Sequence, residues 1–146
     1  MFKNFKFKKA LIGRIPHGED LLGYIENFCV ENKITNAWLT GIGGVNKLCF
    51  GYFDKEKKAY IEKEFDEFME IVNLTGNISL KDGKPFPHLH ISCADKEGKV
   101  FGGHLMPKTE VFATEIIIQE FEGEKDLERT HDKKTGLMLW STEIKY

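Results

Sequence analysis

The sequence predicts an α+β fold in which a mainly antiparallel β-sheet packs against one principal helix. Most of the 146 residues fall into short runs where apolar and polar side chains alternate, which is typical of half-buried strands. Turn residues separate these runs at intervals that favour an antiparallel sheet. A single stretch has apolar residues at helical spacing. No linker or repeat divides the chain, so we expect residues 1–146 to form one domain with its own core.

The predicted helix covers residues 18–32. Its apolar residues recur at helical spacing, and Glu19 and Asp20 fall in the first turn, where the helix dipole favours acidic side chains. We expect this apolar stripe to cover the sheet. The predicted strands cover residues 5–12, 37–40, 45–53, 59–65, 69–80, 87–94, 99–106, 111–121 and 137–144.

Near the N-terminus, lysines alternate with aromatic residues. This pattern predicts an edge strand in which Phe5 and Phe7 face inward while Lys6 and Lys8 face water. The alternative is nucleic-acid contact through charge and base stacking.

Two further segments separate the predicted strands. Residues 81–85 predict a turn. Residues 122–134 contain few apolar side chains and predict a charged loop or a short helix.

Composition restricts the functional classes. With 21 Lys and Arg against 23 Asp and Glu, the formal net charge is −2, so the chain has no overall positive charge with which to neutralise phosphates. We find no apolar run that could span a bilayer and no signal-peptide pattern, and therefore expect a cytoplasmic protein without a membrane partner. The three cysteines each lie in apolar patterns, which predicts reduced core thiols.

The most informative motif is a pair of histidines one residue apart, followed by a third. His88 and His90 alternate with apolar residues and therefore share one face of a strand. Residues 95–98, Asp-Lys-Glu-Gly, predict a type I turn whose glycine adopts a left-handed conformation in a bulge. That turn pairs His90 with His104 and brings all three imidazoles to one face, with Gly102 leaving room beside them. A plain two-residue hairpin would instead place His104 on the opposite face.

Three histidines on one face suit zinc or another borderline divalent ion such as nickel or cobalt. A fourth coordination position would remain for water, a carboxylate or a ligand. The alternative is that the histidines are polar residues on a solvated face or members of a hydrogen-bonded buried network. Cys93 is not expected to ligate, because it alternates with the histidines and therefore faces the core.

The segment Thr-Gly-Ile-Gly-Gly at residues 40–44 could direct backbone N–H groups at an anion. The dinucleotide-binding fingerprint, however, requires a further glycine where Asn46 stands and a helix directly afterwards. Residues 45–50 predict a strand. We therefore favour a tight turn or a β-bulge at these glycines.

Motifs across nearly the whole chain resemble, in order and spacing, the PPC domain that plants and prokaryotes share. They are Arg-Ile-Pro-His-Gly-Glu-Asp at 14–20, the glycine run at 41–45, Glu-Ile-Val-Asn-Leu-Thr-Gly-Asn at 70–77, His-Leu-His at 88–90, the turn at 95–98, Gly-Gly-His-Leu at 102–105 and Thr-Glu at 114–115.

This resemblance implies a compact α+β domain that assembles as a homotrimer. In plants the domain follows an AT-hook in nuclear DNA-binding proteins, whereas the stand-alone prokaryotic type keeps the His-x-His and Gly-Gly-His residues. The present chain resembles the prokaryotic type and lacks the Arg-Gly-Arg-Pro core of an AT-hook. The resemblance also makes the segment that includes Thr40 and Gly41 one wall of a pocket for a small-molecule ligand.

Two glutamates are candidates for a role beside a metal. Glu70 and Glu115 each interrupt an apolar strand and are expected to be partly buried, which would require a partner such as Arg14. They are either structural ion pairs or groups that orient an imidazole or act as a base on metal-bound water. Glu70 is the preferred catalytic candidate, because it belongs to a motif of the family pattern.

Three functional classes remain open. The sequence best supports a PPC-domain protein that binds a divalent metal, with zinc preferred, through His88, His90 and His104. DNA binding by family resemblance is one alternative, and a metal-dependent enzyme acting on a small molecule is another. No residue identifies a substrate or a physiological role.

Overall fold

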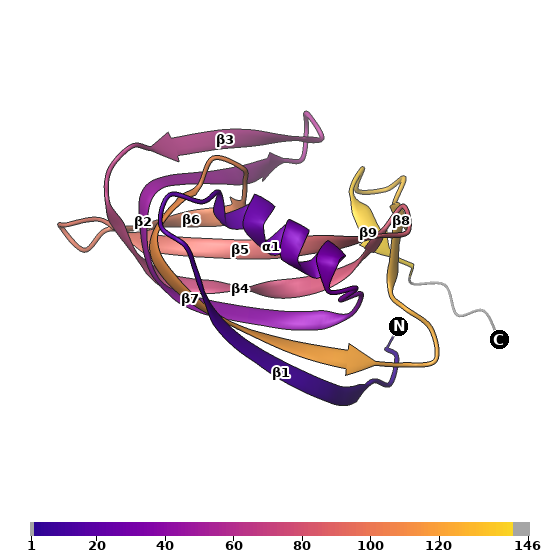
Figure 1. The fold of residues 1–146 in the computed structure, drawn as a ribbon. Helices are drawn as coiled ribbons and strands as arrows, with labels where there is room; N and C mark the ends of the chain where they lie inside the picture. The colour runs from indigo at the N-terminus through magenta and orange to yellow at the C-terminus, as the bar shows by residue number, and fades with distance from the viewer. Residues whose placement is uncertain (1, 142–146) are drawn as a thin grey trace.

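The structure is a computed structural model that describes residues 2–141. Within these residues, nine strands and one helix follow one another along the chain (Figure 1). Their bounds are β1 Lys6–Ile15, α1 Leu21–Glu31, β2 Ala37–Asp54, β3 Ala59–Phe65, β4 Met69–Lys81, β5 Lys84–Ala94, β6 Val100–Leu105, β7 Glu110–Glu122, β8 Glu128–His131 and β9 Met138–Trp140.

The strands form one large sheet that is organised around β2. Its first half pairs with β4 and β7, and its second half pairs with β3 and β6. Strand β5 lies between β4 and β6, so the strands that carry the histidines are held on both sides. All pairings are antiparallel except the short contact between β4 and β8.

Strand β2 bends at its glycines, where its pairing with β4 and β7 shifts register. Gly43 has φ of 132°, and a Cβ at this position would lie 2.0 Å from the carbonyl oxygen of Ala113. Only glycine fits this close approach in that conformation. The predicted bulge is therefore confirmed, although the two strands expected on either side of it form one continuous strand.

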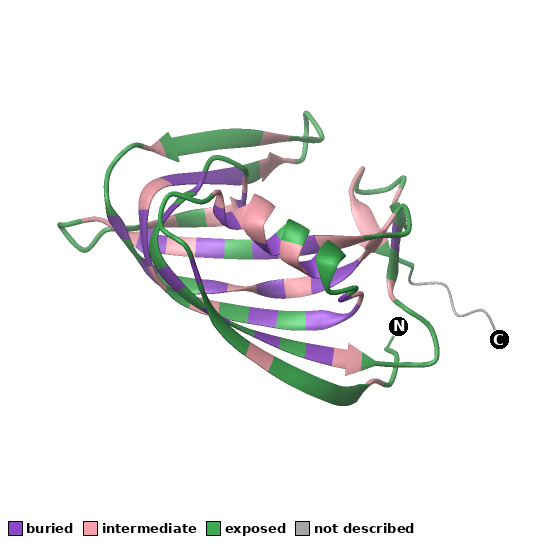
Figure 2. Cartoon of the chain, viewed as in Figure 1, coloured by how far each residue is buried: buried purple, intermediate pink, exposed green. Residues whose placement is uncertain are grey.

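Residues of the helix and of one face of the sheet belong to one apolar core cluster. Leu21, Ile25 and Cys29 of α1 are buried and belong to the same apolar cluster as sheet residues such as Leu39 and Leu89. Along β4 and β5, buried residues alternate with more exposed ones (Figure 2). The histidines lie on the other face of this sheet.

The helix is shorter than the range predicted from the sequence. It begins at Leu21, because the side chain of Asp20 caps the helix by accepting a hydrogen bond of 2.7 Å from the Gly23 N–H. Glu19 and Asp20 therefore precede the first turn rather than forming part of it. Asp20 also forms a β-bridge with Glu110, which holds this residue in an extended conformation.

Strand β1 lies at the edge of the sheet, as predicted. The prediction that Phe7 faces inward is wrong, since this side chain is 58% exposed and packs edge-on against Phe121. A register shift between Phe7 and Lys9 interrupts the regular alternation. As a consequence, Lys8 reaches the buried carboxylate of Glu120 at 2.7 Å.

The charged segment after β7 also differs from the prediction of a loop or short helix. It contains β8, which pairs with the end of β4 and forms a hairpin with β9. The predicted strand at 137–144 is described only as β9, because residues 142–144 lie outside the described residues. The three cysteines are free and buried, as predicted. Among residues 2–141, no helix is both long and apolar enough to cross a membrane.

Candidate metal centre

The turn between β5 and β6 sets the position of the histidines. The Gly98 N–H donates to the Asp95 carbonyl at 2.9 Å, and the Asp95 N–H donates to the Lys99 carbonyl at 3.0 Å. Gly98 has φ of 78°, and the Asp95 carboxylate accepts hydrogen bonds from the Glu97 and Lys99 N–H groups. This is the bulged type I turn that the sequence predicted.

The predicted register is confirmed. His90 pairs with His104, and Ser92 pairs with Gly102. Gly102 has a different role from the one expected, because a Cβ there would lie 2.1 Å from the Ile91 carbonyl oxygen. The absence of a side chain allows β6 to approach β5 closely, rather than leaving space beside the imidazoles.

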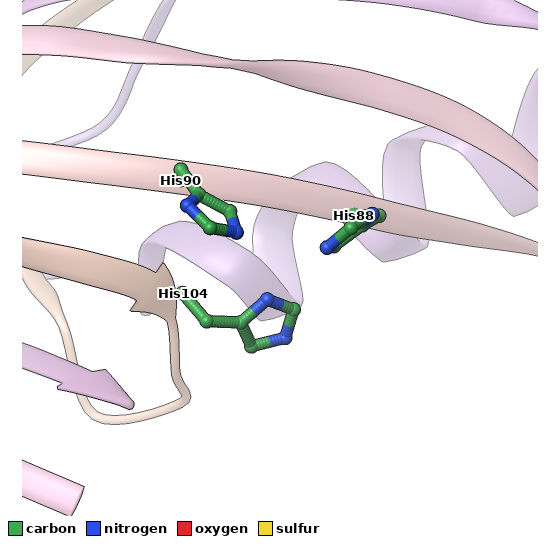
Figure 3. A group of neighbouring side chains, drawn as sticks. All are labelled: His88, His90 and His104. Atoms are coloured by element: carbon green, nitrogen blue, oxygen red, sulfur yellow. The ribbon is translucent and has the colours of Figure 1, made fainter. Parts of the chain in front are cut away.

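The three imidazoles gather on one face of the sheet, and Figure 3 shows their rings turned toward one another. Ring centroids are separated by 5.0 Å for His88 and His104, 5.5 Å for His88 and His90, and 5.6 Å for His90 and His104. One nitrogen from each ring lies within 4.8 Å of the others. A tetrahedral ion at about 2.1 Å from each nitrogen requires spacings of roughly 3.4 Å, which small side-chain rotations would supply.

Burial keeps two of these imidazoles neutral. The pKa of His88 is lowered to about 4, first by desolvation and then by the nearby Arg129 guanidinium. The pKa of His104 is also lowered to about 4, first by desolvation and then by His90. Neutral imidazole is the form that ligates a metal ion, so both rings are in the correct protonation state at pH 7.

The Nδ1 atom of His104 is buried and has no hydrogen-bond partner among the described residues. A buried nitrogen without a partner is uncommon, because its desolvation is not compensated. A metal ion shared with His88 and His90 would supply that partner. The chemistry and the placement of the donor set therefore fit a divalent ion.

Two residues that no sequence motif indicated, Tyr60 and Arg129, also contact the histidines. Tyr60 of β3 stacks on His104 with ring centroids 4.7 Å apart and an interplanar angle of 22°. Gly51 makes this possible, since a Cβ there would lie 2.7 Å from the Tyr60 ring. Arg129 of β8 lies 3.2 Å from Nδ1 of His88 through its Nη2 atom.

These additional residues carried little signal in the sequence. Arg129 stands in a charged segment whose strand character is weak, and only the tertiary fold brings β8 beside β4. Tyr60 belongs to a predicted strand, but its contact with His104 depends on β3 folding back onto the second half of β2.

The pocket residues predicted near the glycine run lie at different distances from the histidines. Thr40 pairs with Thr75, which pairs with His90, so Thr40 shares the histidine face but lies two strands away, roughly 10 Å. Gly41 points toward the core, where a Cβ would meet Leu74 and Ile116.

The structure does not bring the candidate charged residues to the site. Glu70 and Glu115 are exposed, which contradicts the expectation that they are partly buried. Glu70 pairs with Ala94, four residues from His90 and roughly 13 Å along the strand. Arg14 pairs with Glu115 in the strand register, yet it forms no ion pair within the described residues.

A second group of potential ligands consists of Cys49, Glu62 and Glu64. Glu64 is already paired with Lys47 at 2.8 Å and with Lys108 at 3.0 Å. Burial raises the pKa of the Cys49 thiol, which disfavours the thiolate that would bind a metal. This group therefore fits an ion-paired surface better than a metal site.

Comparison with known proteins decides the family. The profile of the Plants and Prokaryotes Conserved domain matches residues 2–122. The chain belongs to this family. This PPC protein is 44% identical to a plant- and prokaryote-conserved protein from Pyrococcus horikoshii, with a TM-score of 0.91 and coverage of 100% of this chain and 99% of the other.

Two further solved structures resemble this PPC protein. A metal-containing protein from Archaeoglobus fulgidus is 41% identical, with a TM-score of 0.91 and coverage of 97% and 99% of the two chains. A protein from Bacteroides thetaiotaomicron, whose name proposes DNA binding, is 30% identical, with a TM-score of 0.83 and coverage of 94% and 96%.

A curated relative is much longer than this PPC protein. The bifunctional protein GlmU of Synechococcus sp. (strain JA-3-3Ab) is 27% identical over 126 residues. The match covers 86% of the present chain but only 19% of that relative.

Proposed function

We propose that this PPC protein binds one divalent metal ion per subunit, with zinc preferred, through His88, His90 and His104. The observation that carries the proposal is the Nδ1 atom of His104, which is buried in a cluster of three imidazoles and has no hydrogen-bond partner among residues 2–141. A structural histidine network would be expected to satisfy this nitrogen with a hydrogen bond. The related metal-containing protein from Archaeoglobus fulgidus supports the same assignment.

Three protein ligands leave at least one coordination position open. This arrangement is typical of zinc sites that bind a further ligand, whereas purely structural zinc sites are closed by four protein ligands. When bound, the ion would supply a Lewis acid at this position. His88 and His104 would present neutral imidazoles, and Tyr60 would hold the His104 ring in place by stacking.

We also propose that the protein assembles as a homotrimer, as the family resemblance implies. Exposed apolar side chains on the histidine face support an assembly. Ile12 is 78% exposed and pairs directly with Ile117, which is 41% exposed. Ile117 in turn pairs with Thr40. Thr40 is linked to His90 through Thr75, so these side chains lie on the histidine face of the sheet. Burial of these side chains against another subunit would remove apolar surface from water.

DNA binding remains the second candidate, because the Bacteroides thetaiotaomicron relative carries this proposal in its name. It predicts an affinity that falls steeply with salt as counterions are released. The net charge of −2 does not favour it. Binding of a mixed-sequence duplex that is independent of the three histidines and weakens steeply with salt would support DNA binding over our proposal.

Zinc titration of metal-free protein with single histidine variants tests the site. Replacing His88, His90 or His104 by Ala should each weaken zinc binding by at least tenfold, because two imidazoles hold the ion less tightly than three. The matched controls are His17→Ala and His131→Ala, which remove exposed histidines elsewhere on the chain. Equal affinity in all five variants would contradict the proposal.

A further inference from the structure

Among the described residues, Arg129 is buried without a carboxylate partner. Arg129 is only 5% exposed, yet each of its hydrogen-bond partners among the described residues is neutral. Nε donates to Ser79 Oγ at 2.9 Å, Nη1 to the Met138 carbonyl at 3.1 Å, and Nη2 to Asn77 Oδ1 at 2.8 Å. A buried charge normally requires a counter-charge, so this guanidinium is prepared for an anion.

The fourth contact of Arg129 is incompatible with metal binding. Nη2 donates toward Nδ1 of His88 at 3.2 Å, so this nitrogen acts as the acceptor. If the other ring nitrogen binds the ion, Nδ1 carries a proton and no longer accepts. If Nδ1 itself binds the ion, its lone pair is used. In either case metal binding by His88 releases an N–H group of Arg129.

The N–H group that His88 releases lies next to a second N–H group of the same guanidinium. A guanidinium has five N–H groups, and Nη1 has one N–H without a partner among residues 2–141. Loss of the His88 contact adds a second free N–H on the neighbouring Nη2. Two N–H groups on adjacent nitrogens match the two oxygens of a carboxylate, which arginine binds in bidentate geometry.

The surroundings favour an organic anion. Asn77 and Trp140 contact Arg129 and also line an open cavity of about 440 Å³, together with Trp38. The lining residues of this cavity do not include Arg129 or the three histidines, so the cavity adjoins the guanidinium only through Asn77 and Trp140. The Trp140 ring lies 5.1 Å from the centre of the guanidinium, which holds the side chain from one side. The aromatic walls of this cavity would accommodate the carbon skeleton of a small ligand.

We propose that Arg129 and the metal-loaded histidine site together bind a small organic carboxylate, with the guanidinium pairing with the carboxylate beside the open coordination position. This inference rests on the proposed function, because the second free N–H group appears only when His88 binds a metal. It assigns the ligand class of the site, and it gives Arg129 a binding role rather than a purely structural one.

Cobalt-substituted protein provides the test, because the visible spectrum of Co²⁺ reports changes in its ligands. Acetate is titrated into the wild type and into Arg129→Gln, with ionic strength held constant by sodium chloride. We expect acetate to perturb the wild-type spectrum and to bind roughly ten- to one-hundredfold more weakly in the variant, from the loss of hydrogen bonds to a charged group. Arg129→Gln should bind Co²⁺ at least as tightly as the wild type does, because the substitution removes a positive charge from beside the ion.

Imidazole serves as a neutral probe of the open position, and its affinity should be the same in both proteins. Arg129→Lys keeps the positive charge but cannot form the bidentate hydrogen bonds, so its acetate affinity should be intermediate. This variant replaces Arg129→Gln in the test if Arg129→Gln does not fold. Arg14→Gln removes the other arginine of the chain, which is exposed, and should behave as wild type.

The possible outcomes separate the two proposals. Absence of cobalt binding by the wild type would overturn the metal site and, with it, this inference. Cobalt binding with equal acetate affinity in wild type and Arg129→Gln would overturn the carboxylate assignment alone.

Discussion

The ring of Tyr60 stacks on the ring of His104 at a centroid separation of 4.7 Å, and it comes from a strand that is not hydrogen-bonded to the strand of His104. The contact covers one side of the imidazole. It thereby links β3 to the candidate metal centre and contributes to the desolvation that keeps His104 neutral.

Loss of this stacking should weaken metal binding. In Tyr60→Ala the His104 ring becomes free to rotate, and we expect zinc affinity to fall roughly three- to tenfold, which corresponds to the energy of one aromatic pair. Tyr60→Phe keeps the ring and should bind zinc as the wild type does. Zinc titration of both variants checks this prediction. An equal loss of zinc affinity in Tyr60→Phe and Tyr60→Ala would show that the hydroxyl, rather than the ring, is important.

The lowered pKa values of His88 and His104 predict how the metal-free protein responds to acid. Both groups stay neutral in the folded state down to about pH 4, whereas in the unfolded chain they take up protons near pH 6.5. Protons therefore bind preferentially to the unfolded state, and the free energy of unfolding should decrease as the pH falls from about 6.5 to about 4.

Urea denaturation of the metal-free protein across this pH range measures the effect. The double variant His88→Gln, His104→Gln lacks both titrating groups, so its stability should decrease less over the same interval. If the free energy of unfolding of the wild type does not decrease more than that of the double variant between pH 6.5 and pH 4, the neutral state of these imidazoles is contradicted.

Gly76 fixes the spacing between β4 and β5 beside the site. A Cβ at this position would lie 2.0 Å from the carbonyl oxygen of His88. Gly76→Ala should therefore destabilise the protein by roughly 1–3 kcal/mol through overpacking, and it should also weaken zinc binding by displacing His88. Gly13→Ala is the matched control, because a Cβ there has no neighbour within 4 Å in the part of the chain that the structure describes. Thermal unfolding that ranks these two variants in the opposite order would refute this role.

The buried thiols should be unreactive in the folded protein. Desolvation raises the pKa of Cys29 to about 12, with a smaller contribution from Glu120, and it raises that of Cys93 to the same value. At pH 8 such a thiol contains roughly a thousandfold less thiolate than an ordinary one. We expect slow labelling by a thiol reagent in the native state and fast labelling of all three cysteines in urea. Rapid native-state labelling of Cys29 or Cys93 would contradict their placement in the core.

The histidine hairpin was the most predictable part of the site, because its determinants are local. Asp95 and Gly98 define one turn type, and the period of two then decides which side chains share a face. A site built on one hairpin can therefore be inferred from a short stretch of sequence. The continuous β2 could not be inferred in this way, since its glycines signal an interruption whether the strand ends there or only bends.

Burial of charged residues was predicted poorly, for a physical reason. Glu70 and Glu115 interrupt apolar runs but occupy the exposed face, whereas Glu120 follows similar apolar residues and is buried beside Lys8. The difference depends on which elements cover each face. Arg129 illustrates the same limit, because its environment includes Ser79 of β4 and His88 of β5, which are distant from it in sequence.

Anomalous diffraction at the zinc edge, from crystals of untagged protein purified without chelator and supplied with zinc, is the most direct test of the central claim. We predict one anomalous peak per subunit, bounded by nitrogen atoms of His88, His90 and His104 at about 2.1 Å. A well-ordered histidine cluster without a peak, or a peak only at Cys49, Glu62 and Glu64, would contradict the account.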